Sequence, residues 1–572
     1  MFAKQESFEV HACRDGRWTI ETTTTTQPDA EALARKALSR QGVSGVRVVR
    51  EVARGDSARE SVVFEQTREL RDSGKIFVND VDEAPYCGTV DELYAIRGRQ
   101  TINRLFRRYL DKNCVTATEV MHDFRELRRI VDADTLIAAG VGKIATLQTK
   151  GRDDIDMPTR RDALYRFLDD VTARARAASE RKLPSIRADG FAGAVGGVTA
   201  SADPADCPFL LRVVVARELV QHRSFFGKLA QTIDWAEPAE DGNARTVVDT
   251  FISDILANAE TLQDLLGQQP NLGAAVGALV DLADGRLADA AEGSLPESAD
   301  ALAARLNALL RLDALPESRL MIVERIRRQI EAKSPLSRGE PEAEAEAFKA
   351  LVDKLMPEDA LFGGSPIAEA LTHRQSRILN KGGTAGLKEA TGRLLPTLAD
   401  PVRKATYLLA LSESRLAGSI GDEIGRQLEG LFVQPASVKQ IVKDNRPPNK
   451  KMQAITKVVG RVRGSTLDEG LKTRISERLD ELLASYIVED RILERVDDPS
   501  RPLHVRAFML LAMCTPEMLP EGRASQLARS IVVKHLRRPN FEGELVAGVP
   551  GAEKERVLRD FHVQLHRCGF LQ

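Results

Sequence analysis

Apolar and polar residues alternate in the first part of the chain. Apolar residues occupy every second position over 8–12 and again over 18–20, and Asp15-Gly16 lies between the two runs. Asp-Gly favours a two-residue turn whose twist matches that of the strands it joins, so this pattern predicts a β-hairpin. The next segments are predicted as a helix and two strands, at 28–38, 46–52 and 61–65. The order ββαββ predicts a small α/β domain over 1–70, with one helix packed on a sheet.

From Asp91 onward the apolar residues recur every three to four positions. Val120, Phe124 and Leu127 show this spacing, which is typical of amphipathic helices. Stretches rich in glycine and proline, such as 183–207, are predicted to connect the helices. The fold class predicted is mainly α: a multi-domain helical bundle or an α-solenoid-like array that follows the small N-terminal α/β (ββαββ) domain.

A change of composition gives the best interior domain boundary. Proline and glycine are followed by alternating glutamate and alanine over 334–347, which indicates an exposed acidic linker leading into a helix. It separates a first helical region, 90–333, from a second, 348–572. Within the second region an Asp-Pro step precedes a block of bulky apolar residues twice, over 399–411 and 497–513. The pattern suggests two repeat-like units, which are too few to define a repeat family.

Length and charge limit the classes of function. A chain of 572 residues exceeds what one hydrophobic core usually holds, and 43% hydrophobic with 29% charged residues is typical of a folded protein. The 82 basic and 84 acidic residues leave a net charge of −2. No global attraction to nucleic acid or anionic lipid is expected from this balance.

The cysteine pattern and the apolar runs suggest a compartment. The six cysteines contain no CxxC pair, which indicates free thiols in a reducing environment. The first ten residues lack the apolar core of a signal peptide, and no run of about 18 apolar residues occurs. We therefore expect no transmembrane segment and a cytoplasmic protein.

Two histidine motifs raise the question of a metal site. Glu119 and His122 form one ExxH motif, whereas a di-iron bundle needs two together with further glutamates. Thr116 stands three residues before Glu119, so a helix capping box is the favoured interpretation. His562 and His566 share a helix face close to a cysteine, but the glutamate of a metalloprotease helix is missing between them. We predict no metal and no cofactor.

Glycine-rich segments are candidates for anion binding. Residues 139–143 fail the P-loop pattern, and 190–197 is interpreted as a flexible connection between helices. The strongest small-ligand candidate follows His373, where backbone amides at a helix start and flanking cations could hold an anion. Its residues are Arg374, Arg377, Lys381, Gly382, Gly383 and Thr384. The alternative is that the glycines end one helix in a left-handed cap and Thr384 caps the next.

A basic tract over 439–463 contains a single acid, Asp444. Its cations are Lys439, Lys443, Arg446, Lys450, Lys451, Lys457, Arg461 and Arg463. Such a cluster could bind phosphates, an acidic protein or an anionic lipid surface, although it has no aromatic residue for stacking on bases. The alternative is a solvated face whose counter-charges lie just downstream, at Asp480, Glu481 and Glu489.

The motifs leave surfaces as the better-supported basis of function. GxSxG is absent, and no cysteine or serine stands in a recognisable nucleophile turn. The leading hypothesis is a non-enzymatic interaction, scaffold or regulatory protein that presents helical surfaces to protein partners. One alternative is binding of nucleic acid or another polyanion through the basic tract. Another is an unrecognised enzyme or ligand sensor around 373–388. Partner identity and oligomeric state do not follow from the residues.

Overall fold

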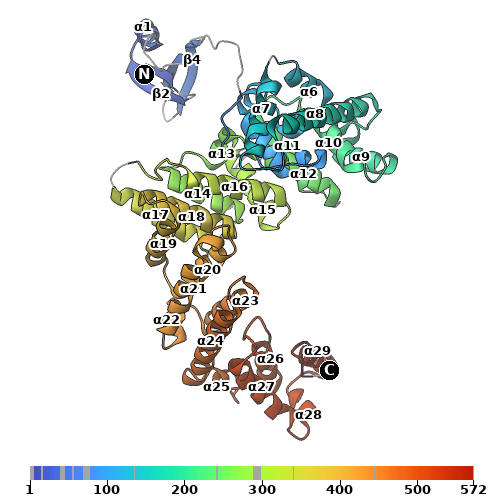
Figure 1. The fold of residues 1–572 in the computed structure, drawn as a ribbon, viewed down its shortest axis with the longest axis vertical. Coiled ribbons are helices and arrows are strands. Elements are labelled where there is room, and N and C mark those ends of the chain that lie inside the picture. The colour runs from blue at the N-terminus through green and yellow to red at the C-terminus, as the bar shows by residue number, and fades with distance from the viewer. Residues whose placement is uncertain are drawn as a thin grey trace. The chain divides into compact units, whose positions relative to one another are not determined.

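The computed structural model describes residues 5–14, 17–38, 45–54, 57–67, 78–133, 135–239, 242–287, 298–338, 341–357, 359–443 and 445–570. The chain divides into two compact units, residues 1–78 and 79–572 (Figure 1). The described residues form 29 α-helices and one four-stranded sheet, which confirms the predicted mainly α fold with a small N-terminal α/β part. None of the helices among these residues is long and apolar enough to cross a membrane.

The N-terminal unit is an antiparallel sheet with one helix packed against it. Its elements are β1 Gln5–Arg14, β2 Arg17–Thr24, α1 Gln27–Leu38, β3 Gly45–Arg54 and β4 Ser57–Thr67, and the strand order is β2-β1-β3-β4. Ala30, Ala34 and Ala37 share one face of α1 and are buried with Phe8 and Val48 of the sheet. The ββαββ order is as predicted, while the Asp15-Gly16 turn lies outside the described residues.

The second unit begins with a bundle built around one buried helix. Its helices are α2 Val90–Tyr94, α3 Ile96–Leu105, α4 Arg107–Asn113, α5 Ala117–His122, α6 Phe124–Val131, α7 Leu136–Thr149, α8 Met157–Glu180, α9 Ile186–Ser201, α10 Cys207–Leu219, α11 Phe225–Ala236, α12 Gly242–Leu256, α13 Ala259–Leu266 and α14 Leu272–Ala283. Helix α12 contacts α3, α5, α10, α11, α13 and α16 (Pro316–Glu331). Every residue from Val247 to Leu256 is buried, so Asp249, Ser253 and Asp254 must find their hydrogen-bond partners inside the protein.

Helix α9 corrects the predicted connection over 183–207. The structure has a helix where the glycines indicated a flexible link, interrupted only at Gly190, whose φ is 70°. Ala194, Val195 and Val198 are buried in the main core. Burial of this face outweighs the low helix propensity of the glycines, which is a local preference of about 1 kcal/mol per residue.

The rest of the chain stacks helical hairpins in two layers. Its helices are α15 Ala299–Arg311, α16, α17 Pro341–Leu355, α18 Gly364–Ile378, α19 Gly383–Leu394, α20 Pro401–Ser412, α21 Ala417–Val433, α22 Val438–Ile441, α23 Pro448–Gly464, α24 Glu469–Glu489, α25 Ile492–Val496, α26 Leu503–Met513, α27 Arg523–Leu536, α28 Phe541–Leu545 and α29 Lys554–Arg567. One layer follows α16, α18, α20 and α23, and the other follows α19, α21, α24 and α27. Successive helix pairs pack on one another along these two layers, as in an α-solenoid (Figure 1).

The hydrophobic core is continuous from Ala178 to Cys568. It includes Leu336, which lies in the predicted acidic linker, and α17 begins at Pro341 and packs against α14. The domain boundary over 334–347 stays a prediction.

Candidate functional site

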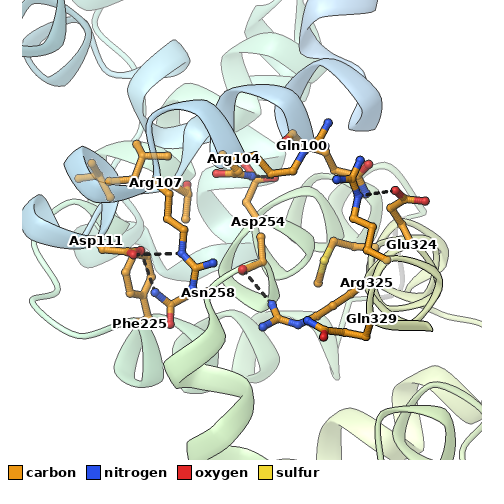
Figure 2. Close-up of a pocket in the computed structure, with 17 residues that line it drawn as sticks. Gln100, Arg104, Arg107, Asp111, Phe225, Asp254, Asn258, Glu324, Arg325 and Gln329 are labelled. Carbon is orange, nitrogen blue, oxygen red and sulfur yellow. Dashed lines mark hydrogen bonds and ion pairs between the residues drawn. The ribbon is translucent and has the colours of Figure 1, made fainter. Parts of the chain in front are cut away.

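A pocket lined by arginines opens in the second unit between α3, α4, α11, α12 and α16. It encloses about 890 Å³ including its open mouth, and four arginines line it: Arg104, Arg107, Arg325 and Arg328. Apolar side chains, among them Leu110, Phe225 and Met321, form part of its wall. Figure 2 shows Arg104 and Arg107 arriving from the α3–α4 turn and Arg325 arriving from α16. We call this site the arginine pocket.

Local helix geometry brings the four arginines to one place. On α16, Ile322, Ile326 and Ile330 are buried at a spacing of four residues, so Arg325 and Arg328 lie on an adjoining face. On the other side, Phe106 ends α3 and begins α4 with non-helical backbone angles, and its ring is buried. Arg104, near the end of α3, and Arg107, the first residue of α4, border the same pocket on either side of this break.

The arginines differ in how their charges are compensated. Asp82 lies 3.6 Å from Nη1 of Arg104 and 3.5 Å from Nη1 of Arg328. Arg107 lies 3.4 Å from Asp111. Arg325 donates to the carbonyl oxygen of Ala257 at 3.1 Å, and no acidic side chain among the described residues lies within ion-pair distance of it. The pocket therefore holds a half-buried guanidinium group that is not neutralised by a carboxylate.

The pocket combines four arginines with three carboxylates, Asp111, Asp254 and Glu324, and neighbouring arginines repel one another. Burial, together with the positive charge of Arg107, lowers the pKa of Arg325 to about 10. Burial and the neighbouring Arg328 also lower the pKa of Arg104. Arg325 and Arg104 remain protonated at neutral pH. An anion in the pocket would offset the repulsion of Arg325 by Arg107 and of Arg104 by Arg328. Guanidinium groups bind carboxylates and phosphates in bidentate geometry, which suits an anion of either class.

A buried polar network supports the floor of the pocket. Asp254, which lines it, accepts hydrogen bonds from Nδ2 of Asn103 at 3.1 Å and from the backbone and hydroxyl of Thr118 at 2.9 and 2.7 Å. Nε of Arg99 also donates to Asp254 at 3.2 Å, and Arg99 is only 1% exposed. The charge of Asp254 is thus compensated from beneath, and α3, α5 and α12 are joined below the pocket.

The predicted anion site at 374–384 is divided by the structure. Arg374 is buried; it donates to the carbonyl oxygen of Ile330 at 3.1 Å and pairs with Glu344 at 2.7 Å. It therefore holds the end of α16 against α17. Arg377 is exposed, and Lys381 pairs with Glu389 at 2.6 Å.

The helix start in this segment also differs from the predicted one. The left-handed residue after α18 is Asn380, with a φ of 52°, although Gly383 also has a positive φ of 69°. Gly382 is the N-cap of α19, so Thr384 lies within the helix rather than at its cap. Asparagine adopts this left-handed conformation more readily than most residues because its short polar side chain can hydrogen-bond to the nearby backbone.

Half of the cations in the basic tract are engaged in tertiary contacts. Lys439 pairs with Asp490 at 2.8 Å, and Arg446 pairs with Asp359 through both of its Nη atoms. Arg461 and Arg463 donate to backbone carbonyl oxygens of other helices or loops. Of the predicted counter-charges, Glu489 acts electrostatically on Lys439. Asp480 instead accepts from the first backbone amides of α27. The remaining cations have no acidic partner among the described residues: Lys443, Lys450, Lys451 and Lys457.

The histidine motifs are occupied by structural contacts. Thr116 and Glu119 form the predicted capping box at the start of α5, which confirms that interpretation. Nε2 of His562 lies 3.1 Å from Glu542, whereas the buried Cys568 thiol donates to the carbonyl oxygen of Leu511. Within the described part of the chain, no group of three or more histidine, cysteine, aspartate or glutamate side chains is placed to hold a metal ion.

Comparisons of the chain with protein families, curated proteins and solved structures found no match.

The arginine pocket was not predicted from the sequence. Its only local signal is arginine at three-residue spacing, at 104 and 107 and again at 325 and 328, and arginines are common on exposed helix faces.

Proposed function

We propose that the chain is a non-enzymatic regulatory protein that binds a small organic anion in the arginine pocket. The observation that carries the proposal is Arg325, a half-buried guanidinium lining the pocket without a carboxylate partner among the described residues. Such a charge is costly to keep away from water unless a counter-ion accompanies it. The predicted ligand sensor around 373–388 is thereby replaced by a site elsewhere on the chain.

The composition of the wall favours an organic anion with several negative charges. Arg107 and Arg325 border the same pocket and repel each other, so a single bound group between them gains from both. Leu110, Phe225 and Met321 offer apolar surface beside the guanidinium groups. A compact carbon skeleton bearing two or more carboxylates or phosphates matches this combination.

Replacing Arg325 with glutamine is expected to weaken anion binding by at least about tenfold, because a charge-assisted hydrogen bond is lost. Calorimetric titration with citrate, succinate and inorganic phosphate measures the affinity. Arg319→Gln is the matched control, since Arg319 lies on the same helix outside the pocket lining. The proposal fails if wild-type protein binds none of the three anions, or if both variants bind like wild type.

The hypothesis of protein partners accompanies this proposal. Two-layer stacks of helical hairpins present extended surfaces to other proteins, and the stack over α16–α27 supports such a role. A regulatory protein would then report the anion to its partner. Capture from cell extract with and without citrate would identify a partner whose recovery depends on the anion.

A second candidate function is polyanion binding through the basic tract. It is favoured by Lys450 and Lys457, which are exposed on α23 without an acidic partner among the described residues. Lys450→Glu is expected to lower affinity for mixed RNA and to reduce the slope of log K against log salt by about one. Lys349→Glu is the control, because it makes the same change of charge at an exposed lysine of another helix, α17. Equal effects of the two substitutions, or no binding at low salt, would remove this candidate.

A further inference from the structure

We propose that Asp82 and Glu83 act as an internal competitor for the anion. In the empty pocket they occupy the rim arginines, and anion binding releases the segment 79–84 that carries them. This inference rests on the proposed function, because it describes how occupancy of the same pocket is regulated. It concerns the stretch of the second unit that directly follows the N-terminal unit in the chain.

The acidic pair reaches the rim arginines from two directions. Asp82 lies between Arg104 and Arg328, at 3.6 and 3.5 Å, and Glu83 pairs with Arg328 and, at 3.2 Å, with Arg327. The backbone oxygen of Glu83 accepts a further hydrogen bond from Nη2 of Arg104 at 3.3 Å. Arg104 and Arg328 also line the pocket. An anion that engages these two guanidinium groups therefore competes with the segment for them.

The acidic side chains hold the rim arginines weakly because they are exposed. The side chain of Asp82 is 83% exposed and that of Glu83 is 48% exposed. Burial, which raises the pKa of Asp82, is outweighed by its own backbone hydrogen bond and by Arg328 and Arg104, so the pKa is lowered and the group is ionised at neutral pH. Exposed ion pairs contribute little to stability, whereas an anion inside the pocket would be partly desolvated and held more strongly.

The segment is suited to a local release. Residues 79–88 form neither helix nor strand. Beyond the acidic pair, the carbonyl oxygens of Pro85 and Cys87 accept from Gln148 and Arg160, each at 2.6 Å, and Cys87 is buried. These contacts lie away from the pocket lining and do not involve its arginines. Release of 79–84 also breaks the hydrogen bond that the Asn79 amide donates to the Leu105 carbonyl oxygen at 2.7 Å, and the ion pair between Asp80 and Lys143. Movement is thus confined to the residues before Pro85.

Hydrogen exchange of the full-length protein with and without citrate tests the release. Wild-type protein is expected to exchange backbone amides of 79–84 faster when citrate is bound, while the amides of 86–90 remain unchanged. The D82N/E83Q variant is expected to exchange 79–84 quickly without citrate and to show no further change with it. Binding of citrate that leaves exchange of 79–84 unaltered in wild type would overturn the inference and leave the proposed function intact.

Citrate affinity provides the reciprocal measurement. D82N/E83Q is expected to bind citrate about fivefold or more tightly, since coupling between two competing ligands is mutual. D153N/D154N is the matched control: it removes two adjacent exposed carboxylates that do not contact the pocket, and it should bind within about twofold of wild type. Equal gains in both variants would show a general charge effect and contradict competition. Absence of citrate binding in every variant would instead remove the proposed function.

Discussion

Replacing Lys228 with methionine is expected to destabilise the region around α5 and α11 by about 3–5 kcal/mol. Nζ of Lys228 lies 2.5 Å from Oε1 of Glu119, and both side chains are fully buried. Without the cation, a carboxylate remains in apolar surroundings and its desolvation is no longer offset. Native-state hydrogen exchange of α5 and α11 measures the loss locally, because a unit of this size need not unfold in one two-state step.

The destabilisation by this substitution is expected to grow with pH. Burial raises the pKa of Glu119 even beside Lys228, and removing the cation raises it further. A carboxyl whose pKa is raised by folding favours the folded state below its unfolded pKa, and this contribution is lost as the pH rises through the folded value. The variant should therefore differ least from wild type below about pH 4.3 and most in mildly alkaline solution.

A second substitution at the partner separates charge from packing. In E119Q/K228M no buried charge remains, and the new amide side chain can still accept the 2.7 Å hydrogen bond that the Thr116 amide donates to Glu119. The double variant should recover much of the stability that K228M loses. A double variant less stable than K228M would show that the pair does not act through its charge.

Replacing Arg99 with methionine is expected to lower the local stability of the protein by about 3–5 kcal/mol, as does breaking a buried ion pair. Arg99 donates to the Tyr94 carbonyl at 2.9 Å, the Ser253 hydroxyl at 2.9 Å, Asp254 at 3.2 Å and Glu317 at 2.7 Å. It therefore joins α3, α12 and α16 beneath the arginine pocket. The exchange protection of α12 measures this loss.

The same substitution is expected to weaken citrate binding by at least about tenfold, because Asp254 would face the pocket without its cationic partner and would repel an anion. D254N introduced into R99M removes that charge and should restore part of the affinity. Arg99→Lys keeps the cation but cannot reproduce the planar fork of hydrogen bonds. Its citrate affinity should therefore be closer to the wild-type value than its local stability is. Citrate affinity unchanged in R99M would show that the network does not influence the pocket.

Local signals made the secondary structure readable from the residues. The alternation before Ile20 and the alanine face of α1 are periodic patterns within short segments, and these patterns suffice for the ββαββ order. Thr116 and Glu119 predict their capping box for the same reason, since both partners lie within one helical turn. Helix α9 is different: its glycines are poor helix formers, and burial of Val198 in the core outweighs that preference.

The candidate site could not be predicted because the role of a charged side chain depends on which groups lie beside it in the folded protein. Arg374 and Arg446 look available in the sequence, yet one is held by carbonyl groups at the end of α16 and by Glu344, and the other by Asp359. Arg325 has no distinguishing pattern around it. It becomes a candidate because it lines the pocket without an acidic side chain among the described residues within ion-pair distance, whereas Glu83 and Glu324 pair with Arg328.

The sequence by itself determines the classes of element in this protein, the order of the N-terminal module and the presence of extensive amphipathic helix. These follow from the spacing of apolar residues, which is a local property of the chain. Only the tertiary structure decides which arginines are neutralised and which face a pocket, because an ion pair between helices distant in the chain depends on how the core stacks them. For this chain, that decision moves the small-ligand candidate from the segment around 373–388 to the arginine pocket, where α16 meets the α3–α4 turn.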